Sequence, residues 1–267
     1  MSIDDRAGPE VPPTPGDDHA EACVAARNVG KRFGSVVAIE NATFTIPNRH
    51  FTAVLGPSGC GKSTLLRLIA GLVPHEGELD VKGQPVSGPR PDVGLMFQHP
   101  TLLPWRSALE NVLLPTVIRG RVTDRDREQA MQYLSLVGLE GFEFSYPRQL
   151  SGGMQQRTSL ARLLMTGAQV LLLDEPFGAL DEFTRERLNL ELVRIHEEIE
   201  ATTLFVTHNI TEAVFLADEI LVMTPRPGRL AGVVQVPFER PRGIELQRTT
   251  AFTDIVFDVR EMLGAAL

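Results

Sequence analysis

Long apolar runs are missing from this 267-residue sequence, whose longest stretch without a formal charge, 93–105, holds only 13 residues. A helix needs about 20 apolar residues to cross a bilayer, so we expect no transmembrane helix. Basic residues are also few, since 26 Lys and Arg face 34 Asp and Glu and leave a net charge of −8. Because affinity for nucleic acid rests largely on positive charge, this balance disfavours a nucleic-acid partner.

Cysteines are scarce as well, and only Cys23 and Cys60 are present. Two cysteines are too few for a disulfide framework, and they lack the C-x2-C spacing of a zinc site. We therefore expect no structural metal.

The first 22 residues lack a basic start, an apolar segment and a small-residue cleavage site, which together make a secretory signal. We expect the protein to stay in the cytosol. The same segment holds six acidic residues, one Arg and four Pro, with few apolar side chains. Such a composition buries too little apolar surface to fold, and it predicts a flexible acidic leader over 1–22.

The rest of the sequence contains short apolar runs that alternate with helical patterns. The runs at 51–55, 170–173, 203–206 and 220–223 predict buried strands. Apolar residues at helical spacing predict helices after the first run, through Leu65, Leu68, Ile69 and Leu72, and over 182–199. This alternation is typical of an α/β fold with a largely parallel sheet.

Two regions depart from the alternation. Residues 106–141 show helical apolar spacing with no intervening strand, which predicts a helical subdomain inserted into the sheet, at about 100–165 with its flanks. Residues 245–267 carry apolar side chains three to four positions apart and predict a C-terminal helix.

A glycine-rich segment follows the first predicted strand and fits the pattern G-x4-G-K-[ST]. Its residues are Gly56, Pro57, Ser58, Gly59, Cys60, Gly61, Lys62, Ser63 and Thr64. Glycines allow backbone N–H groups to converge on a β-phosphate, and the start of the next helix adds positive potential. Lys62 is expected to reach the β- and γ-phosphates and Ser63 to ligate Mg²⁺. The segment predicts a P-loop NTPase, with Cys60 serving only for packing.

Two acidic residues, Asp174 and Glu175, close the second predicted strand. A buried strand that merely ends in two solvated acids is the ordinary explanation when no phosphate loop is present. Beside a phosphate loop, Asp174 is expected to hold the metal and Glu175 to act on the attacking water.

The segment Leu150–Arg157, LSGGMQQR, is similar to the LSGGQ signature of ABC transporter ATP-binding subunits, with Met154 in place of the usual Gln. Ser151 can cap the next helix, and Gly152 and Gly153 leave amides open to an anion. The chain resembles that family from Val24 to Arg242. The resemblance implies an ABC ATPase domain over 23–244 with an N-terminal antiparallel β part.

The resemblance also implies a homodimer, because this signature serves the ATP held by the opposite subunit. It gives roles to four further residues, with ATP and Mg²⁺ as cofactors. Phe33 resembles the aromatic that stacks on adenine, although a core position is the alternative for one Phe among 13. Gln98 resembles the loop glutamine that contacts Mg²⁺ and senses the membrane partner, Asp181 the dimer contact, and His208 the residue that contacts the γ-phosphate.

Two function classes share these motifs: an importer subunit that serves a separate permease, and a soluble ABC ATPase acting on nucleic acid or ribosomes. Only 89 positions separate Lys62 from Ser151, which leaves no room for the long coiled coil of repair ATPases. The chain carries one cassette, unlike translation-type members, and no membrane helices of its own, unlike most exporters. The importer subunit therefore fits best.

The segments HPTLLPWRSALENVLLP, MTPRPGRL and VPFERPR resemble the branch that imports nitrate, sulfonates and taurine. By this resemblance the protein is peripheral on the cytoplasmic face of the inner membrane. It would serve permease subunits and, indirectly, a solute-binding protein. Trp105 is expected either near the permease groove or in the core of the helical subdomain.

Overall fold

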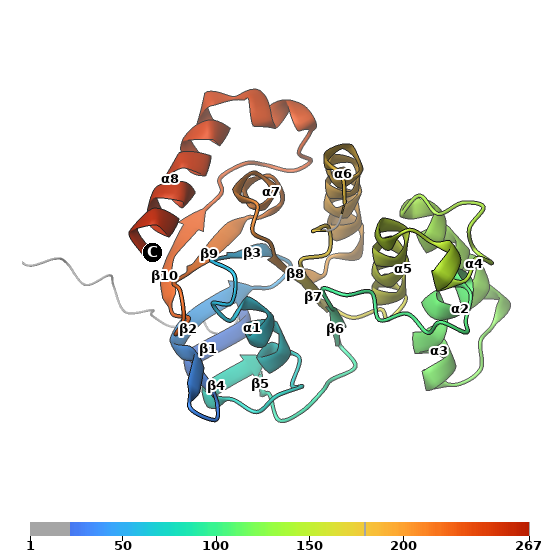
Figure 1. The fold of residues 1–267 in the computed structure, drawn as a ribbon, viewed down its shortest axis with the longest axis horizontal. Helices are drawn as coiled ribbons and strands as arrows, with labels where there is room; N and C mark the ends of the chain where they lie inside the picture. Colours follow the sequence, from blue (N-terminus) through green and yellow to red (C-terminus); the bar gives the residue numbers. More distant parts are fainter. Residues whose placement is uncertain (1–21, 179, 267) are drawn as a thin grey trace, which may run out of the picture.

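The computed structural model describes residues 22–178 and 180–266, which form two sheets and their covering helices (Figure 1). The acidic leader predicted over 1–22 lies outside the described residues except for Ala22. Within the described part, none of the helices combines the length and the apolar character needed to cross a membrane.

A six-stranded sheet forms the centre of the molecule, in the order β10-β9-β3-β8-β7-β6. Its strands are β3 (Phe51–Leu55), β6 (Val93–Met96), β7 (Val170–Asp174), β8 (Thr202–Val206), β9 (Glu219–Met223) and β10 (Leu230–Gln235). All pairs are parallel except β10 with β9. The predicted α/β fold with a largely parallel sheet is confirmed.

The continuous apolar runs arise because both faces of this sheet are covered. Every residue of β3, β7, β8 and β9 is buried. Successive side chains point to opposite faces of a strand: Leu171 and Leu173 join one core cluster, whereas Val170 and Leu172 join the other. A polar side chain at any of these four positions of β7 would therefore be buried in an apolar layer.

Two strands of this sheet were not predicted from the sequence. β6 has only four residues, and its Gly94 lies so close to α5 that a Cβ would meet Leu163 Cδ1 at 2.5 Å. β10 alternates between half-buried and exposed positions at the edge of the sheet, so it lacks the continuous apolar run of its neighbours.

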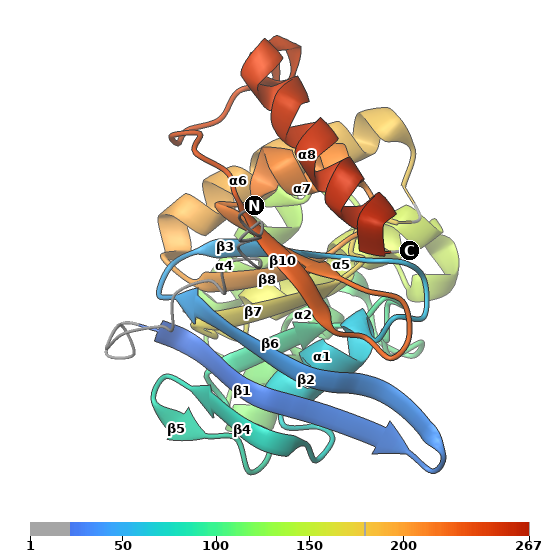
Figure 2. The same cartoon turned by 90° about the vertical axis from the view of Figure 1, so that its left-hand side faces the viewer.

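The antiparallel part expected near the N-terminus is a four-stranded sheet in the order β2-β1-β4-β5 (Figure 2). Its strands are β1 (Ala22–Phe33), β2 (Val36–Pro47), β4 (Glu76–Val81) and β5 (Gln84–Pro85). Helix α1 (Lys62–Ile69) contacts strands of both sheets and buries Leu65, Leu66 and Leu68 between them. The start of α1 is thereby fixed relative to both sheets.

Helix α1 is shorter than its apolar pattern predicts. It ends at Ile69, and Leu72 lies beyond it with 48% of its surface exposed. Gly71 has φ +69°, and a Cβ there would meet the Gly88 carbonyl oxygen at 2.1 Å. A left-handed glycine of this kind ends a helix, so the apolar spacing overran the true boundary.

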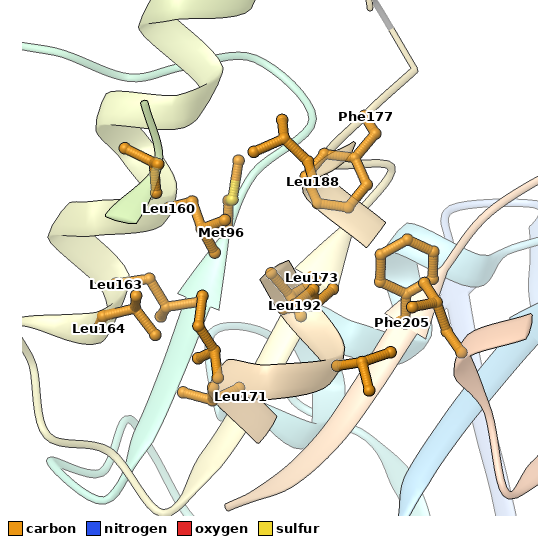
Figure 3. Packing of buried hydrophobic residues seen from close by; sticks show 14 of the residues in the cluster. Met96, Leu160, Leu163, Leu164, Leu171, Leu173, Phe177, Leu188, Leu192 and Phe205 are labelled. Atoms are coloured by element: carbon orange, nitrogen blue, oxygen red, sulfur yellow. The ribbon is translucent and has the colours of Figure 1, made fainter. Parts of the chain in front are cut away.

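Four helices gather at one side of the molecule, at the right of Figure 1. They are α2 (Ala108–Val112), α3 (Leu114–Arg119), α4 (Asp124–Leu136) and α5 (Gly152–Leu164), with a 3-10 turn, η2 (Pro147–Gln149), before α5. Capping boxes at Ser107 and Thr123 start α2 and α4. Figure 3 shows Leu160, Leu163 and Leu164 of α5 beside Met96 and Leu171 of the central sheet.

The remaining helices lie on the same face of the six-stranded sheet as α5, and their buried apolar residues belong to the same core cluster. They are α6 (Glu182–Ile199), α7 (Ile210–Leu216) and α8 (Thr250–Ala266), with a 3-10 turn, η3 (Ile244–Arg248), before α8. The predicted C-terminal helix thus begins at Thr250, after this turn. Helix α8 packs on α7, β9 and β10 through Phe252 and Val259, which are both buried.

A buried histidine makes the packing of α6 sensitive to pH. His196 stacks edge-on against Phe51 with ring centroids 5.2 Å apart, and its Nδ1 lies 3.1 Å from Thr203 Oγ1. Burial, assisted by the positive charge of Arg240 and opposed by the nearby Asp218, lowers the pKa of His196 from 6.5 to about 4. The imidazole is therefore neutral in the folded protein at pH 6.

The unfolded chain binds a proton at this histidine below pH 6.5, whereas the folded chain does so only near pH 4. Stability from the neutral ring is thus complete above pH 6.5 and is lost as the pH falls toward 4. We expect the free energy of unfolding to fall by about 1 kcal/mol more in the unaltered protein than in His196→Gln between pH 7.5 and 5.8. Urea unfolding at both pH values measures this, and equal losses in the two proteins would contradict it.

Candidate functional site

The phosphate loop lies at the carboxyl end of β3 and leads directly into α1. Gly61 is the N-cap of α1 and has φ +113°, a backbone angle that residues with a side chain rarely adopt. A Cβ at Gly61 would also meet the Ala38 carbonyl oxygen of β2 at 2.9 Å. The glycine thus allows the loop to pack closely against the antiparallel sheet at the start of α1.

Lys62 is the buried cation of this loop, with only 5% of its surface exposed. Its Nζ donates to the carbonyl oxygens of Gly56 at 2.8 Å and Pro57 at 3.0 Å. The ammonium group is therefore held inside the phosphate loop by two neutral backbone carbonyl groups. A bound phosphate can compete for these donors, because hydrogen bonds between ions are stronger than those to carbonyls.

Ser63 and Asp174 bring two elements of the site together. Ser63 Oγ donates to Asp174 Oδ1 over 2.9 Å, which joins the start of α1 to the end of β7. Burial raises the pKa of Asp174, the Ser63 hydrogen bond opposes this, and the neighbouring Glu175 raises it further. A buried carboxylate beside a hydroxyl is a donor set of hard oxygens that suits Mg²⁺.

Glu175 has an unusual backbone, with φ +45° directly after β7. Its amide N–H donates to the Val206 carbonyl oxygen of β8 at 3.0 Å. Few residues other than glycine adopt a positive φ, and such strain concentrates at functional sites. Here the hydrogen bond to β8 stabilises this backbone conformation, and the Glu175 side chain lines the cleft at the end of the strands.

Two polar side chains face the Glu175 carboxylate. His208 Nδ1 lies 3.4 Å from Glu175 Oε2, and Gln98 Nε2 donates to the same oxygen over 3.5 Å. Gln98 is itself tied to the signature helix α5, since the side-chain amide of Gln156 donates through Nε2 to the backbone carbonyl oxygen of Gln98. Because Gln98 contacts both α5 and Glu175, a movement of α5 would shift Gln98 relative to the Glu175 carboxylate.

These groups line one open cleft of about 690 Å³. The lining residues are Phe33, Val36, Ala38, Ser58, Gly59, Gly61, Lys62, Ser63, Thr64, Gln98, Glu175, His208 and Arg226. Of the remaining phosphate-loop residues, Gly56 and Cys60 are buried beneath the cleft, as is Asp174. A Cβ at Gly56 would meet Cys60 Sγ at 2.8 Å, so the thiol fills the underside of the loop.

Four other predicted site residues, at the starts of α5 and α6, also lie outside the lining of this cleft. Ser151 caps α5, where its hydroxyl accepts from the Met154 amide at 3.2 Å, and Gly152 and Gly153 form the first turn. Asp181 caps α6 by accepting from the Thr184 amide at 3.0 Å, a bond that lowers the Asp181 pKa. Ser151, Gly152 and Asp181 are exposed, so they are free to face another molecule.

Met154, which departs from the usual signature, is half-buried and packs against the main core cluster. The side chain therefore contributes to the seating of α5. Ser151 and both glycines precede it and keep their places at the helix start.

Two aromatic residues for which the sequence left alternatives are exposed. Phe33 has 49% of its surface exposed and faces the cleft, with Lys31 Nζ 5.2 Å from the ring centroid. Trp105 is 70% exposed in the loop before α2. The structure thus excludes a core position for either ring.

Sequence reasoning missed Arg226 as a lining residue of the cleft. Its Nε and Nη2 both donate to the Gly59 carbonyl oxygen, at 3.2 and 3.0 Å. The segment MTPRPGRL carries a family resemblance, but nothing in it predicts that Arg226 lies beside a loop 167 residues away.

Comparison with protein families places residues 39–178 within a family model described as ABC transporter. A taurine import ATP-binding protein of Rhizobium johnstonii is 45% identical over 84% of this chain and 84% of its own. A nitrate import ATP-binding protein of Synechococcus elongatus is 45% identical over 80% and 81%. An aliphatic sulfonates import ATP-binding protein of Bacillus cereus is 41% identical over 80% and 86%.

Solved structures give the same result for the fold. A dimeric ATP-binding cassette in a post-hydrolysis state, bound to ADP and phosphate, superposes with a TM-score of 0.73 at 32% identity. The match covers 81% of this chain and 100% of that one. A dimeric bacterial ABC transporter cassette superposes with a TM-score of 0.74, also at 32% identity.

Proposed function

The chain belongs to the ABC transporter family, and from that premise we propose that it binds and hydrolyses ATP in the cleft beside Lys62 to drive solute uptake. The sequence resemblance to the nitrate, sulfonate and taurine branch is confirmed. The observation that carries the proposal is the meeting of phosphate loop, Asp174 and Glu175 around one cleft. The ATPase unit is proposed to span 23–244, with the helical subdomain at about 100–165 and a C-terminal segment at 245–267.

We propose that two copies assemble head to tail around two ATP molecules. The cleft is open to solvent, and the exposed start of α5 supplies free amides and a hydroxyl elsewhere on the chain. Ser151, Gly152 and Gly153 of one copy would then face the γ-phosphate held by the other. Two solved relatives of similar fold are dimeric cassettes, which supports this arrangement.

In the proposed reaction, water attacks the γ-phosphorus of ATP as the bond from phosphorus to the bridging oxygen breaks. Glu175 orients the water and accepts its proton, while His208 and Gln98 hold the Glu175 carboxylate through its Oε2 atom. Lys62 and the amides of the loop stabilise charge on the β- and γ-phosphate oxygens. Because these groups are already in place before the reaction, their stabilisation of the transition-state charge would contribute most of the rate acceleration.

Mg²⁺ fits the residues that are present. Ser63 Oγ and the Asp174 carboxylate are 2.9 Å apart at the phosphate loop, with Gln98 lining the same cleft. These residues would hold the ion, directly or through water, together with phosphate oxygens. When bound, Mg²⁺ neutralises charge on the β- and γ-phosphates.

We propose that the helical side of the molecule docks on a separate permease at the cytoplasmic face of the inner membrane. Trp105 and Phe144 are 70% and 73% exposed. Their segments lie together, since the Ala108 amide donates to the Ser145 carbonyl oxygen at 2.9 Å. Large exposed aromatic side chains on adjoining segments favour a protein partner, and Trp105 is proposed to touch it.

The transported solute is proposed to be a small molecule of the nitrate, sulfonate or taurine type, delivered by a solute-binding protein. The support is that three relatives, 41–45% identical to this chain, are import ATP-binding proteins for taurine, nitrate and aliphatic sulfonates. The described residues of this chain would act on ATP and on the permease. The choice of solute would therefore rest with the permease and the solute-binding protein.

Purification of the chain with the membrane subunits that it retains tests this function. ATP hydrolysis by the complex in vesicles should rise several-fold when taurine, nitrate or an alkanesulfonate is added with its binding protein. The same complex without binding protein is the control. Recovery of the chain with ribosomes or nucleic acid, and no membrane subunit, would overturn the importer assignment in favour of the soluble class.

A further inference from the structure

The loop between β9 and β10, residues 224–229, packs directly on the phosphate loop. A Cβ at Gly228 would meet the Cys60 carbonyl oxygen at 2.0 Å, so only glycine allows this approach. The Gly228 amide donates to the Ala38 carbonyl oxygen at 3.0 Å, and its own carbonyl accepts from the Glu40 amide at 2.9 Å. The loop is thus fixed to β2 on one side and to the phosphate loop on the other.

Side-chain hydrogen bonds hold the shape of this loop. Thr224 Oγ1 accepts from the Arg229 amide at 3.0 Å and donates to the carbonyl oxygens of Pro225 and Pro227. The backbone on both sides of Arg226 is therefore held by hydrogen bonds within the loop.

Arg226 and Arg229 have different surroundings although they are only three residues apart. Arg229 pairs with Glu40 over 2.6 Å, outside the cleft lining. Arg226 is exposed, lines the cleft, and has no carboxylate within ion-pair distance among the residues that the structure describes. Its Nε and Nη2 donate to the neutral Gly59 carbonyl oxygen, so its positive charge in the wall of the cleft is not paired with a carboxylate.

We propose that Arg226 is a further nucleotide-binding residue, whose guanidinium group donates hydrogen bonds to the phosphate chain of the bound nucleotide. This inference rests on the proposed function of the same cleft. Gly59 belongs to the loop that cradles the phosphates, and the guanidinium is anchored on it. A planar fork with five N–H donors leaves donors free for phosphate oxygens after the two bonds to Gly59.

Electrostatics favours the phosphate chain over the base as the partner of Arg226. Lys62 is buried on its own loop carbonyls, and its single charge does not balance the several negative charges of a nucleotide. A second cation in the same wall lowers the energy of the bound anion, and its contribution is screened by salt because Arg226 is exposed.

Calorimetric titration with ADP tests the proposal without hydrolysis. We expect Arg226→Ala to raise the Kd for ADP roughly tenfold at 100 mM KCl, a loss typical of one charge-assisted hydrogen bond. The ratio of the two Kd values should fall to about threefold at 400 mM KCl. Arg226→Lys keeps the charge without the fork and should lie between. Arg229→Ala removes the same charge from the same loop and should stay within about twofold of the unaltered Kd.

Each alternative result has a definite meaning. A Kd for Arg226→Ala within twofold of the unaltered protein would overturn the inference while leaving the proposed function intact. Equal losses in Arg226→Ala and Arg226→Lys that do not change with salt, together with a lowered melting temperature, would also overturn it and make Arg226 a support for Gly59. An unaltered protein that binds no ADP would overturn the proposed function itself.

Discussion

Replacing Glu175 with Gln is expected to slow ATP hydrolysis by about 10²- to 10⁴-fold, the range typical for loss of a general base. The amide keeps the size of the side chain and can still contact Gln98 and His208, which lie 3.5 and 3.4 Å from Oε2. It cannot accept a proton from the attacking water. The change is therefore confined to chemistry, and the affinity for ATP should stay within about twofold.

The measurement compares steady-state hydrolysis and ATP binding in the two proteins. Glu182→Gln is a matched control, because Glu182 is an exposed acid in the first turn of α6 that does not line the cleft. Its rate should equal that of the unaltered protein. Steady hydrolysis by Glu175→Gln at the unaltered rate would remove Glu175 from the proposed role.

The same variant tests the dimer. If ATP joins two copies and hydrolysis separates them, Glu175→Gln with ATP and Mg²⁺ should elute as a dimer in size-exclusion chromatography, whereas the unaltered protein should return to a monomer. A variant that stays monomeric at millimolar ATP, although it binds nucleotide, would contradict the head-to-tail assembly and leave the ATP site itself unaffected.

Replacing Lys62 with Ala should have its main effect on binding. The ammonium group lies inside the phosphate loop, 2.8 and 3.0 Å from the carbonyl oxygens of Gly56 and Pro57. Its loss removes a buried cation from the place where the β- and γ-phosphates are expected. Hydrogen bonds to charged groups contribute about 1.5–3 kcal/mol each, so the Kd for ATP should rise at least roughly 100-fold.

Equilibrium binding of ATP measures this loss, with Lys82→Ala as the control. Lys82 is an exposed lysine in the turn after β4 and lines a different hollow. Its removal should leave the Kd for ATP unchanged. Because Lys62 is buried, the melting temperature of the variant is needed as well. A folded Lys62→Ala protein that binds ATP with unaltered affinity would contradict the proposed role of the loop.

The sequence alone indicated most of the central sheet and the chemistry of one wall of the cleft. Apolar runs gave β3, β7, β8 and β9 because strands that are covered on both faces carry mostly apolar side chains. It failed where local pattern was weak, as in β6, with four residues, and the edge strand β10. It also overran the end of α1, since apolar spacing continues to Leu72 beyond Gly71.

What the sequence determined by itself is local: the glycine pattern of the phosphate loop, the strand that ends in Asp174 and Glu175, and the cap at Ser151. Each depends on backbone geometry within a few residues, so residue type and spacing suffice. Only the tertiary structure placed Arg226 on Gly59, 167 residues away, and left Phe33 exposed at the cleft. These contacts follow from the order of strands in two sheets, and short-range sequence patterns carry no record of that order.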